Sequence, residues 1–157
     1  MADKASSSIS SSVFKDQMKA TIFGSLNYEP ADSSQKWIFT RKSINASANL
    51  LGTQKDFLQT GEAITVSDKY KWVAIKNIST SKTDGIGINL DGGDAADYTT
   101  ADSFFISGGE VVILKCPNTT VQNLHVASVT MDGTYGYPSA TNGSAVDAHV
   151  FAILKDV

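Results

Sequence analysis

The chain has 157 residues, a mass of 16.7 kDa and a formal charge of −3, so it has room for about one domain. Hydrophobic residues make up 41% and charged residues 18% of it, which argues against a disordered chain, and no apolar run is long enough for a membrane helix. One arginine among 13 basic residues and an isoelectric point near 5.2 argue against binding to nucleic acid.

The composition predicts an all-β fold. Asp outnumbers Glu by 13 to 3, and Ile plus Val outnumber Leu by 23 to 8. Asp prefers turns and caps to helix interiors, whereas β-branched side chains pack well on a pleated sheet. We therefore expect an antiparallel β-sandwich, jelly-roll-like, with about eight strands.

A serine-rich segment opens the chain. Six serines surround Ile9 within residues 6–12, so we expect a flexible N-terminal arm over residues 1–12 and a single β-sandwich domain over residues 13–157. The arm either frays in solvent or becomes ordered on a neighbouring subunit. It lacks the apolar stretch of a secretory signal, so we expect the protein to be made, and to stay, in its host cytoplasm or in a particle assembled there.

The following part of the chain is less regular. Residues 13–28 predict a helical turn followed by a strand, and Pro30 marks a loop over Glu29–Gln35. A strand is expected over Trp37–Ile44. Residues Asn45–Gln59 contain apolar side chains but fit neither the strand period nor the helix period.

Strand-like runs then recur at short intervals between turn residues, which is typical of a sandwich or barrel. In the run that begins at Gly85, Ile86 and Ile88 fall on one face, and the glycines on the other face allow another group to approach closely. Residues 110–116 and 148–154 are apolar on both faces, so we expect them to be covered by the opposing sheet and by another element or subunit. The expected strands are Ile64–Val66, Lys71–Ile78, Gly85–Leu90, Ser103–Ile106, Glu110–Cys116, Asn123–Thr130 and Ala148–Leu154.

The aromatic residues divide between strands and one long loop. Trp37 and Trp72 lie in expected strands, where we expect them to pack in the core. The loop Met131–Asp147 carries Tyr135 and Tyr137, which are candidates to contact a ligand or a protein neighbour.

The acidic loop Asp91–Asp97 is the best candidate for a metal site. Its three carboxylates could gather around Ca²⁺, but their spacing matches neither an EF-hand nor a calcium-binding repeat. We interpret the loop as a solvated turn that uses Asp for its backbone preferences. No metal or other cofactor is expected.

The sequence shows no constellation of catalytic residues. His125 and His149 fall in expected strands, and no nucleophile elbow of the G-x-S-x-G type is present. Cys116 is the only cysteine, which excludes an internal disulfide, and its apolar strand predicts a buried thiol with a raised pKa. We expect a protein that is not an enzyme and has no catalytic, cofactor-binding or metal-binding residues.

Two segments resemble a known group of proteins. They read KWVAIKNISTSKTDGIGINLDGG and SGGEVVILKCPNTTVQNLHVASVT, with a strand that ends in KNIS, a glycine-spaced strand, a GGE turn and an NTT loop before LHVAS. This pattern, over residues 64–154, resembles the small β-sandwich structural proteins of tailed-bacteriophage virions, in particular head decoration or cement proteins. The resemblance implies a non-enzymatic protein that binds the assembled head and stabilises it by bridging subunits.

The resemblance also implies the partners and the location. We expect the chain in the virion, bound to the major capsid protein or other virion proteins and to further copies of itself in a homo-oligomer. The alternative is a carbohydrate- or receptor-binding β-sandwich, as a tail or fibre module or a lectin. That function would use the loop Met131–Asp147 and a Ca²⁺ at Asp91–Asp97.

Overall fold

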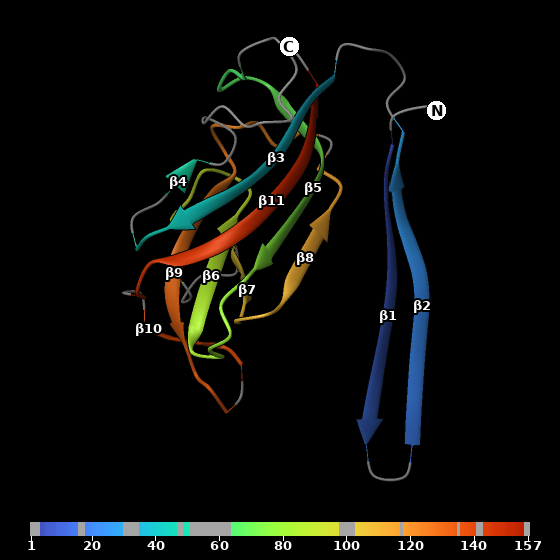
Figure 1. Cartoon of the computed structure of the whole chain (residues 1–157), viewed down its shortest axis with the longest axis vertical. Coiled ribbons are helices and arrows are strands. Elements are labelled where there is room, and N and C mark those ends of the chain that lie inside the picture. Colours follow the sequence, from blue (N-terminus) through green and yellow to red (C-terminus); the bar gives the residue numbers. More distant parts are fainter. Residues whose placement is uncertain are drawn as a thin grey trace. The chain divides into compact units, whose positions relative to one another are not determined.

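Strands account for all of the regular secondary structure in the described part of the chain (Figure 1). The computed structural model describes residues 4–15, 18–29, 35–46, 49–50, 64–97, 103–116, 118–134, 136–140 and 143–155. The strands are β1 (Ala5–Lys15), β2 (Met18–Tyr28), β3 (Gln35–Ile44), β4 (Asn49–Leu50), β5 (Lys69–Asn77), β6 (Asp84–Asn89), β7 (Ser103–Ile106), β8 (Val111–Leu114), β9 (His125–Met131), β10 (Pro138–Ala140) and β11 (Val146–Lys155). The predicted all-β, antiparallel sandwich is confirmed.

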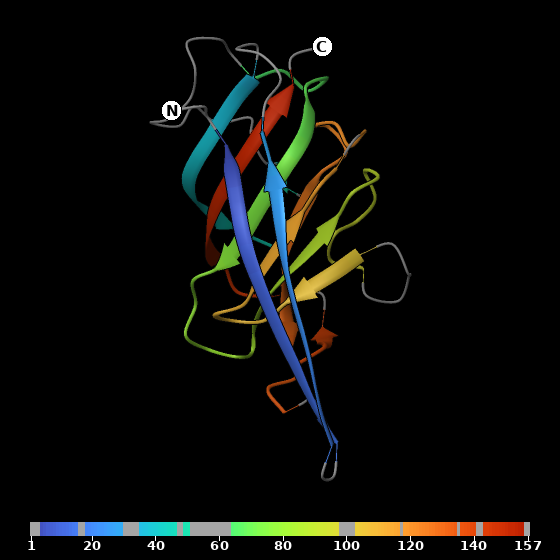
Figure 2. The same ribbon diagram turned by 90° about the vertical axis from the view of Figure 1, so that its right-hand side faces the viewer.

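The chain divides into two compact units, Met1–Ser33 and Ser34–Val157. The first unit contains β1 and β2, which have eleven residues each and pair antiparallel along their whole length (Figure 2). Residues 5–12, expected to belong to a flexible arm, lie in β1, and residues 13–15 continue that strand in place of the expected helical turn. The compact unit that contains them ends at Ser33 and not at residue 12. The serine-rich stretch becomes a strand because β2 offers its backbone a complete antiparallel partner, which composition alone does not show.

Two sheets form the second unit. One has the strand order β3-β11-β5-β8, and the other has the order β10-β9-β6-β7, with β4 also paired to β9. Eight of these strands pair in a nested way: β3 with β11, β4 with β9, β5 with β8, and β6 with β7. The first strand of the eight thus pairs with the last, and the second pairs with the seventh.

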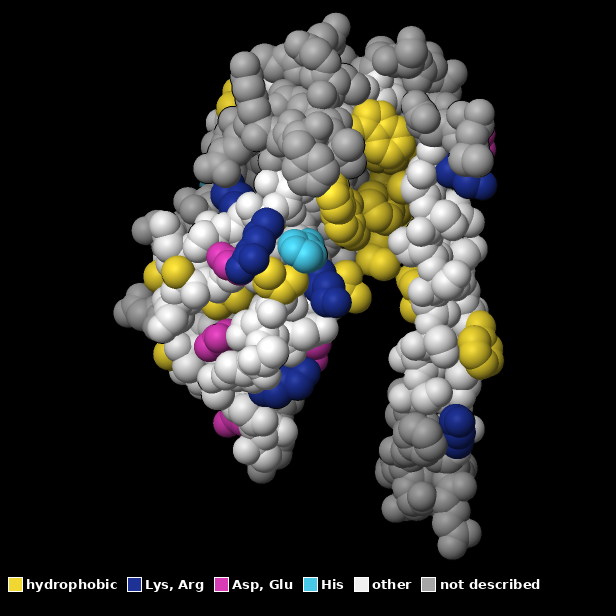
Figure 3. Space-filling model, viewed as in Figure 1, with side chains coloured by type: hydrophobic (Ala, Val, Ile, Leu, Met, Phe, Trp, Pro, Cys, Tyr) yellow, Lys and Arg dark blue, Asp and Glu magenta, His cyan; other side chains and the backbone are white. Residues whose placement is uncertain are grey.

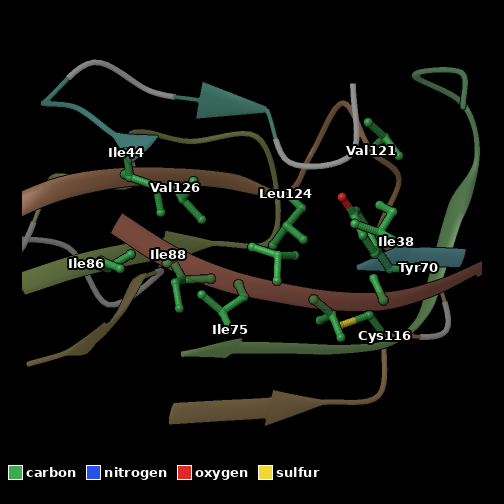
Figure 4. Packing of buried hydrophobic residues seen from close by; sticks show 14 of the residues in the cluster. Ile38, Ile44, Tyr70, Ile75, Ile86, Ile88, Cys116, Val121, Leu124 and Val126 are labelled. Carbon is green, nitrogen blue, oxygen red and sulfur yellow. The ribbon is translucent and has the colours of Figure 1, made fainter. Parts of the chain in front are cut away.

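The core lies between these two sheets (Figure 4). Figure 4 shows Ile75 of one sheet and Ile86, Ile88 and Val126 of the other directed into the same space. All four side chains are fully buried, and full burial of such a side chain contributes about 1.5–3 kcal/mol. The strands alternate inward and outward side chains, so this core uses one face of each sheet.

A second apolar cluster covers the other face of β6 and β9. It contains Ala95, Ala96, Ala127, Val129 and Met131, with Phe105 packed against them. A Cβ atom added to Gly87 would overlap the carbonyl oxygen of Ala95. The expectation that the glycines of β6 admit a close neighbour is confirmed. At Gly87 the neighbour is the acidic loop that follows β6, and at Gly85 it is the side chains of Val129 and Met131.

The strand predictions hold for most of the second unit. The strand over Trp37–Ile44 is confirmed as β3, and six of the seven runs expected after Gly61 are confirmed with ends shifted by at most two residues. The run Ile64–Val66 is instead a turn, in which the Thr65 N–H donates to Asp68 Oδ2 at 2.8 Å. Most of Asn45–Gln59 lies outside the described residues, as does most of Glu29–Gln35.

The KNIS and GGE motifs meet at one connection between strands. Asn77, which is fully buried, donates from Nδ2 to the carbonyl of Asp84 at 2.7 Å and accepts from the Ser79 N–H at 3.0 Å. Its backbone bonds to Gly109 and Glu110 of the GGE turn, where Gly109 has a φ of 85°. The motif residues therefore hold turns of the sandwich together.

Candidate interaction surface

The sheet β3-β11-β5-β8 has a second face, directed away from the core. The register places Phe39 opposite Phe151, and it places Trp37 and Trp72 on either side of Ile153. These positions alternate with the core positions of the same strands, so their side chains share the opposite face. We call this set the outer face: Trp37, Phe39, Trp72, Ala74, Val111, Ile113, Phe151 and Ile153.

An aromatic pair lies across two strands of the outer face. The rings of Phe39 and Phe151 stack with their centroids 4.3 Å apart and their planes at 12°. Both side chains are half-buried. An aromatic pair of this kind contributes about 0.5–1.5 kcal/mol beyond its area burial.

The two tryptophans lie on the outer face and are not part of the cluster between the sheets. The expected burial is confirmed for Trp72, whereas Trp37 is only half-buried. Their strand positions have the opposite parity to Ile38 and Val73. Trp72 is 7% exposed and Ile153 is 1% exposed, so part of the outer face excludes water. The indole Nε1 of Trp72 is buried and has no hydrogen-bond partner among the described residues.

The outer face is more open toward β8. Val111 is 52% exposed, and Figure 3 shows hydrophobic side chains gathered on the side of the sandwich where β11, β5 and β8 run. The double coverage expected for residues 110–116 is therefore not provided at Val111 by the described residues of one chain. Coverage by another subunit stays a prediction.

One end of this sheet face is charged. Arg41 donates from both Nε, at 3.1 Å, and Nη2 to Asp147 Oδ2. The hydrogen bond from Arg41 holds the pKa of Asp147 below its usual value. Lys76 and His149, which are paired in register and exposed, lie nearby. The face thus changes from charged to apolar along β11.

An open pocket of about 390 Å³ borders this charged end. Its polar groups pair with one another, because Arg41 bonds to Asp147 and the Ser79 hydroxyl donates to Asp84 Oδ2 at 2.6 Å. Arg41 thus balances the charge of Asp147, whereas Asp84 receives a hydrogen bond from a neutral hydroxyl group. The wall consists of Arg41, Ile78, Ser79, Thr80, Asp84, Ala145, Val146 and Asp147.

The two faces of the hairpin of β1 and β2 differ in polarity, although Phe23, which is 77% exposed, lies on the more polar one. Residues that oppose each other across an antiparallel pair share a face. The apolar pairs are Ala5–Tyr28, Ser7–Leu26, Ile9–Gly24 and Ser11–Ile22, and we call them the hairpin face. The pairs that alternate with them are Ser6–Asn27, Ser8–Ser25, Ser10–Phe23 and Ser12–Thr21.

Hydrogen bonds between side chains mark the polar side of the hairpin. The Ser6 hydroxyl donates to Asn27 Oδ1 at 2.8 Å, and the hydroxyls of Ser12 and Thr21 are 3.0 Å apart. On the hairpin face, by contrast, Ile22 is 73% exposed. Sequence reasoning missed this surface because the apolar residues of β1 are few and appear on one face only once β2 is placed in register. The available signal was serine at every second position opposite a strand of the same length.

The acidic loop Asp91–Asp97 uses its carboxylates to bind its own backbone. Asp91 Oδ1 accepts from the Gly93 N–H at 3.1 Å, and Asp94 Oδ1 accepts from the Ala96 N–H at 2.9 Å. The ring Nδ1 of His125 lies 2.9 Å from the Gly93 carbonyl oxygen. Among the residues that the structure describes, no group of three or more His, Cys, Asp or Glu could hold a metal ion.

The remaining candidate residues are dispersed. His125 lies in β9 and His149 lies in β11, so they belong to different sheets. Cys116 is buried, and burial raises the pKa of its thiol although a hydrogen bond with Thr119 opposes the shift, as the sequence predicted. The long loop Met131–Asp147 contains β10, and Tyr137 in it is 56% exposed; Tyr135 lies outside the described residues.

Comparisons of the chain with protein-family models, with curated proteins and with solved structures give no match. Over the ranges that the structure describes, no helix is long and apolar enough to cross a membrane. The geometry itself defines the class of protein: an antiparallel β-sandwich with an aromatic outer face and a separate amphipathic hairpin.

Proposed function

We propose that the chain is a non-enzymatic structural protein of a tailed-bacteriophage virion, a decoration or cement protein that binds the assembled head and bridges its subunits. The observation that carries this proposal is the amount of apolar surface outside the sandwich core. A two-sheet sandwich is complete with one buried face per sheet, yet this chain adds the outer face and the hairpin face. Such surfaces are characteristic of proteins that assemble.

The fold supports the proposal. Eight strands pair in a nested way across a four-stranded and a five-stranded sheet, and this pairing resembles that of jelly rolls, which viral capsid proteins and lectins share. Because one fold can host several functions, the function of this chain must be argued from its surfaces and not from its fold alone.

The mechanism needs no reacting group. Each copy buries apolar area against its neighbours, and a contact of modest free energy is repeated over many symmetric copies of the shell. A copy that touches two shell subunits makes the second contact at a high effective concentration, so dissociation of either subunit is slowed. The shell then resists heat and osmotic swelling.

The proposal is tested with heads assembled from the major capsid protein that the same genome encodes. Sedimentation should recover the chain with these heads at a fixed copy number, and heads that carry it should open at a higher temperature than bare heads. Bovine serum albumin serves as the negative control for trapping in the pellet. No co-sedimentation and an unchanged opening temperature would overturn the proposal, as would the absence of any head gene from that genome.

A second candidate function, carbohydrate or receptor binding, is favoured by one observation. Tyr137 is 56% exposed beside the β9–β10 turn, where its ring could stack on a sugar. Glycan-array binding that disappears in the Tyr137→Ala variant would support this function. The backbone hydrogen bonds of Asp91 and Asp94 lead us to expect no effect of a calcium chelator on such binding.

A further inference from the structure

We infer that the charged end of the sheet β3-β11-β5-β8 binds an acidic segment of a different protein, in which Asp or Glu carboxylates lie beside aliphatic side chains. The inference concerns the sandwich alone and does not rest on the proposed virion function. The site, which we call the basic patch, consists of Arg41, His149, Lys76 and Val111 and of the adjacent pair Phe39 and Phe151.

This sheet face is basic although the chain as a whole is acidic. The chain has 13 Lys and Arg residues against 16 Asp and Glu residues. The described strand positions directed away from the core reverse this balance, because Asp147 is the one acid among them. Their Lys and Arg residues are Arg41, Lys69, Lys76 and Lys155. A surface of one sign attracts and orients a partner of the opposite sign.

Three basic side chains lie side by side in one row of the basic patch. His149 is opposite Arg41 on one neighbouring strand and opposite Lys76 on the other, and strands are about 4.8 Å apart. All three side chains are exposed. Arg41 pairs with Asp147, whereas neither His149 nor Lys76 forms an ion pair within the described part of the chain. Like charges directly opposite each other destabilise a sheet, so carboxylates of a partner would stabilise this row.

The aromatic pair beside this row favours carboxylates over nucleic-acid bases. Phe39 and Phe151 are directly opposite each other on neighbouring strands, and their rings are stacked with the centroids 4.3 Å apart. The stacking direction therefore runs across the strands, and each ring directs its edge away from the sheet. The edge of an aromatic ring carries partial positive charge, which attracts a carboxylate oxygen. A base would need an exposed ring face on which to stack.

The apolar part of the basic patch favours a protein over a lipid surface. Val111, opposite Lys76, is 52% exposed, whereas Phe39 and Phe151 are half-buried. One short aliphatic side chain can pack against an aliphatic side chain of a partner but offers little to insert into a bilayer. Figure 3 shows basic and histidine side chains next to hydrophobic ones on this side of the sandwich.

The described parts of this chain do not supply the acidic segment. The strands β1 and β2 contain two lysines and no Asp or Glu, so their charge has the same sign as that of the basic patch. In the acidic loop, Asp91 and Asp94 already accept hydrogen bonds from backbone N–H groups of that loop. Charge complementarity therefore indicates a different protein and not a second copy.

Two labelled peptides test whether carboxylates are recognised. One alternates Glu with Val and the other alternates Gln with Val, each with a polyethylene glycol tail for solubility, so they differ only in their charge. In fluorescence-anisotropy titrations at physiological salt, the full-length chain should bind the Glu peptide about tenfold more tightly than the Gln peptide. Equal affinities, or no binding of the Glu peptide, would overturn the inference.

Two exposed lysines of the same sheet face provide a matched pair of variants. Lys76→Gln should weaken binding of the Glu peptide by about fivefold. Lys155→Gln should leave it within about twofold, because Lys155 lies about 20 Å from His149 along β11 and charge is screened over about 8 Å at physiological salt. Equal effects would show attraction to charge without a site and would overturn the inference.

Two exposed valines test the apolar contact. Val111 in the basic patch is 52% exposed, and Val66, in the turn before β5, is 50% exposed. Val111→Ser should weaken binding of the Glu peptide, and Val66→Ser should not. Because both side chains are exposed, circular dichroism should show an unchanged fold for both variants. Equal affinities of the two variants for the peptide would contradict the assigned contact.

An NMR titration locates the contact and separates the classes of partner. Adding the Glu peptide to the ¹⁵N-labelled chain should shift amide signals around Arg41, Lys76 and His149. Shifts confined to β1 and β2, or to the sheet that contains β6 and β9, would overturn the inference. Tighter binding of oligo(dT) or of phosphatidylglycerol vesicles at matched charge would also overturn it, in favour of that class. So would self-association of the wild type that Lys76→Gln abolishes, because a second copy would then be the partner.

Discussion

Gly87 lies where the acidic loop crosses β6, and the carbonyl of Ala95 occupies the space that a side chain would need. Asn77 and Asp94 likewise act through the backbone groups to which they bond. At the scale of single residues, these polar and small side chains therefore hold the loops against the sandwich. Substitutions at these positions are expected to change stability without touching the apolar core.

Gly87→Ala should destabilise the sandwich by about 3 kcal/mol, because the new methyl group would overlap the Ala95 carbonyl. Urea unfolding followed by tryptophan fluorescence measures the change. Gly133→Ala is the control, since its Cβ would meet only a Thr83 methyl group at 3.3 Å, and its effect should stay below about 0.5 kcal/mol. Similar effects of the two variants would contradict the assigned role of Gly87.

The Arg41–Asp147 pair predicts a pH effect at the acidic end of the scale. The Arg41 hydrogen bond keeps the pKa of Asp147 below 3.8 in the folded protein. A depressed pKa contributes stability that is present above the unfolded value and is lost as the pH falls through the folded value. The contribution is small because both side chains are solvent-accessible. Carboxyl ¹³C NMR should show the pKa rising toward its usual range in Arg41→Gln, with less change in Arg41→Lys; an unchanged titration would contradict the assignment.

Buried charge joins two elements at one end of the sandwich. Lys36 of β3 donates to Asp68, just before β5, at 2.9 Å, and their side chains are 3% and 0% exposed. Asp68 also accepts the Thr65 N–H, which explains why residues 64–66 form a turn despite their strand-like pattern. At the scale of elements, this ion pair fixes the start of β5 against β3.

Breaking this pair from one side should be costly. Lys36→Met leaves the Asp68 carboxylate buried without a cation and is expected to cost about 3–5 kcal/mol. The double variant Lys36→Met with Asp68→Asn removes both charges and retains an acceptor for Thr65, so it should recover most of the loss. A double-mutant cycle by chemical denaturation measures the coupling, and simple additivity of the two changes would contradict it.

The hairpin should exchange its amide hydrogens faster than the sandwich does. A two-stranded hairpin alone is only marginally stable in water, so β1 and β2 should open more often than strands that pack in a core. Exchange in β5 and β11, which are paired on both edges, should be slower. Mass spectrometry of peptic fragments makes the comparison, and equal exchange in all four strands would contradict the prediction.

Nested pairing determines how the whole molecule folds. Arg41 and Asp147, which lie on the paired strands β3 and β11, are 106 positions apart in the chain. Forming such long-range pairs costs a large amount of chain entropy before packing of the core stabilises them. The sandwich cannot be assembled from local hairpins alone.

Refolding should therefore be slow. A rate constant of about 1 s⁻¹ or lower is expected after dilution from urea, because strand pairs of high sequence separation dominate the fold. Double-jump experiments separate this phase from proline isomerisation, which takes tens of seconds. Complete refolding within about a millisecond would contradict the prediction.

Strands could be predicted from the sequence where the pattern of neighbouring residues alone determines them. The alternation of Ile86 and Ile88 with glycine, and the apolar run at Ala148–Leu154, predicted strands because period and turn residues agreed. The burial of Cys116 followed for the same reason. Ile64–Val66 was misread because a side-chain hydrogen bond from outside the run decides its shape.

The candidate surface was less accessible to sequence reasoning. Trp37 and Trp72 were assigned to the core because aromatic residues in strands usually pack there, and only the register showed the other face. The hairpin face depends on two strands being aligned residue by residue, so neither strand reveals it alone. Apolar surface for a partner and apolar surface for a core have the same appearance in a sequence.

The pairing of Gln35 with Lys155 has a practical consequence for engineering. The sandwich begins and ends on adjacent antiparallel strands, so a short turn could join these two residues and new ends could be opened at the exposed turn around Gly133. Such a circular permutant would present the sandwich without its hairpin while leaving every strand intact. The hairpin could then be added as a separate peptide, and its effect on the sandwich could be measured as a function of peptide concentration.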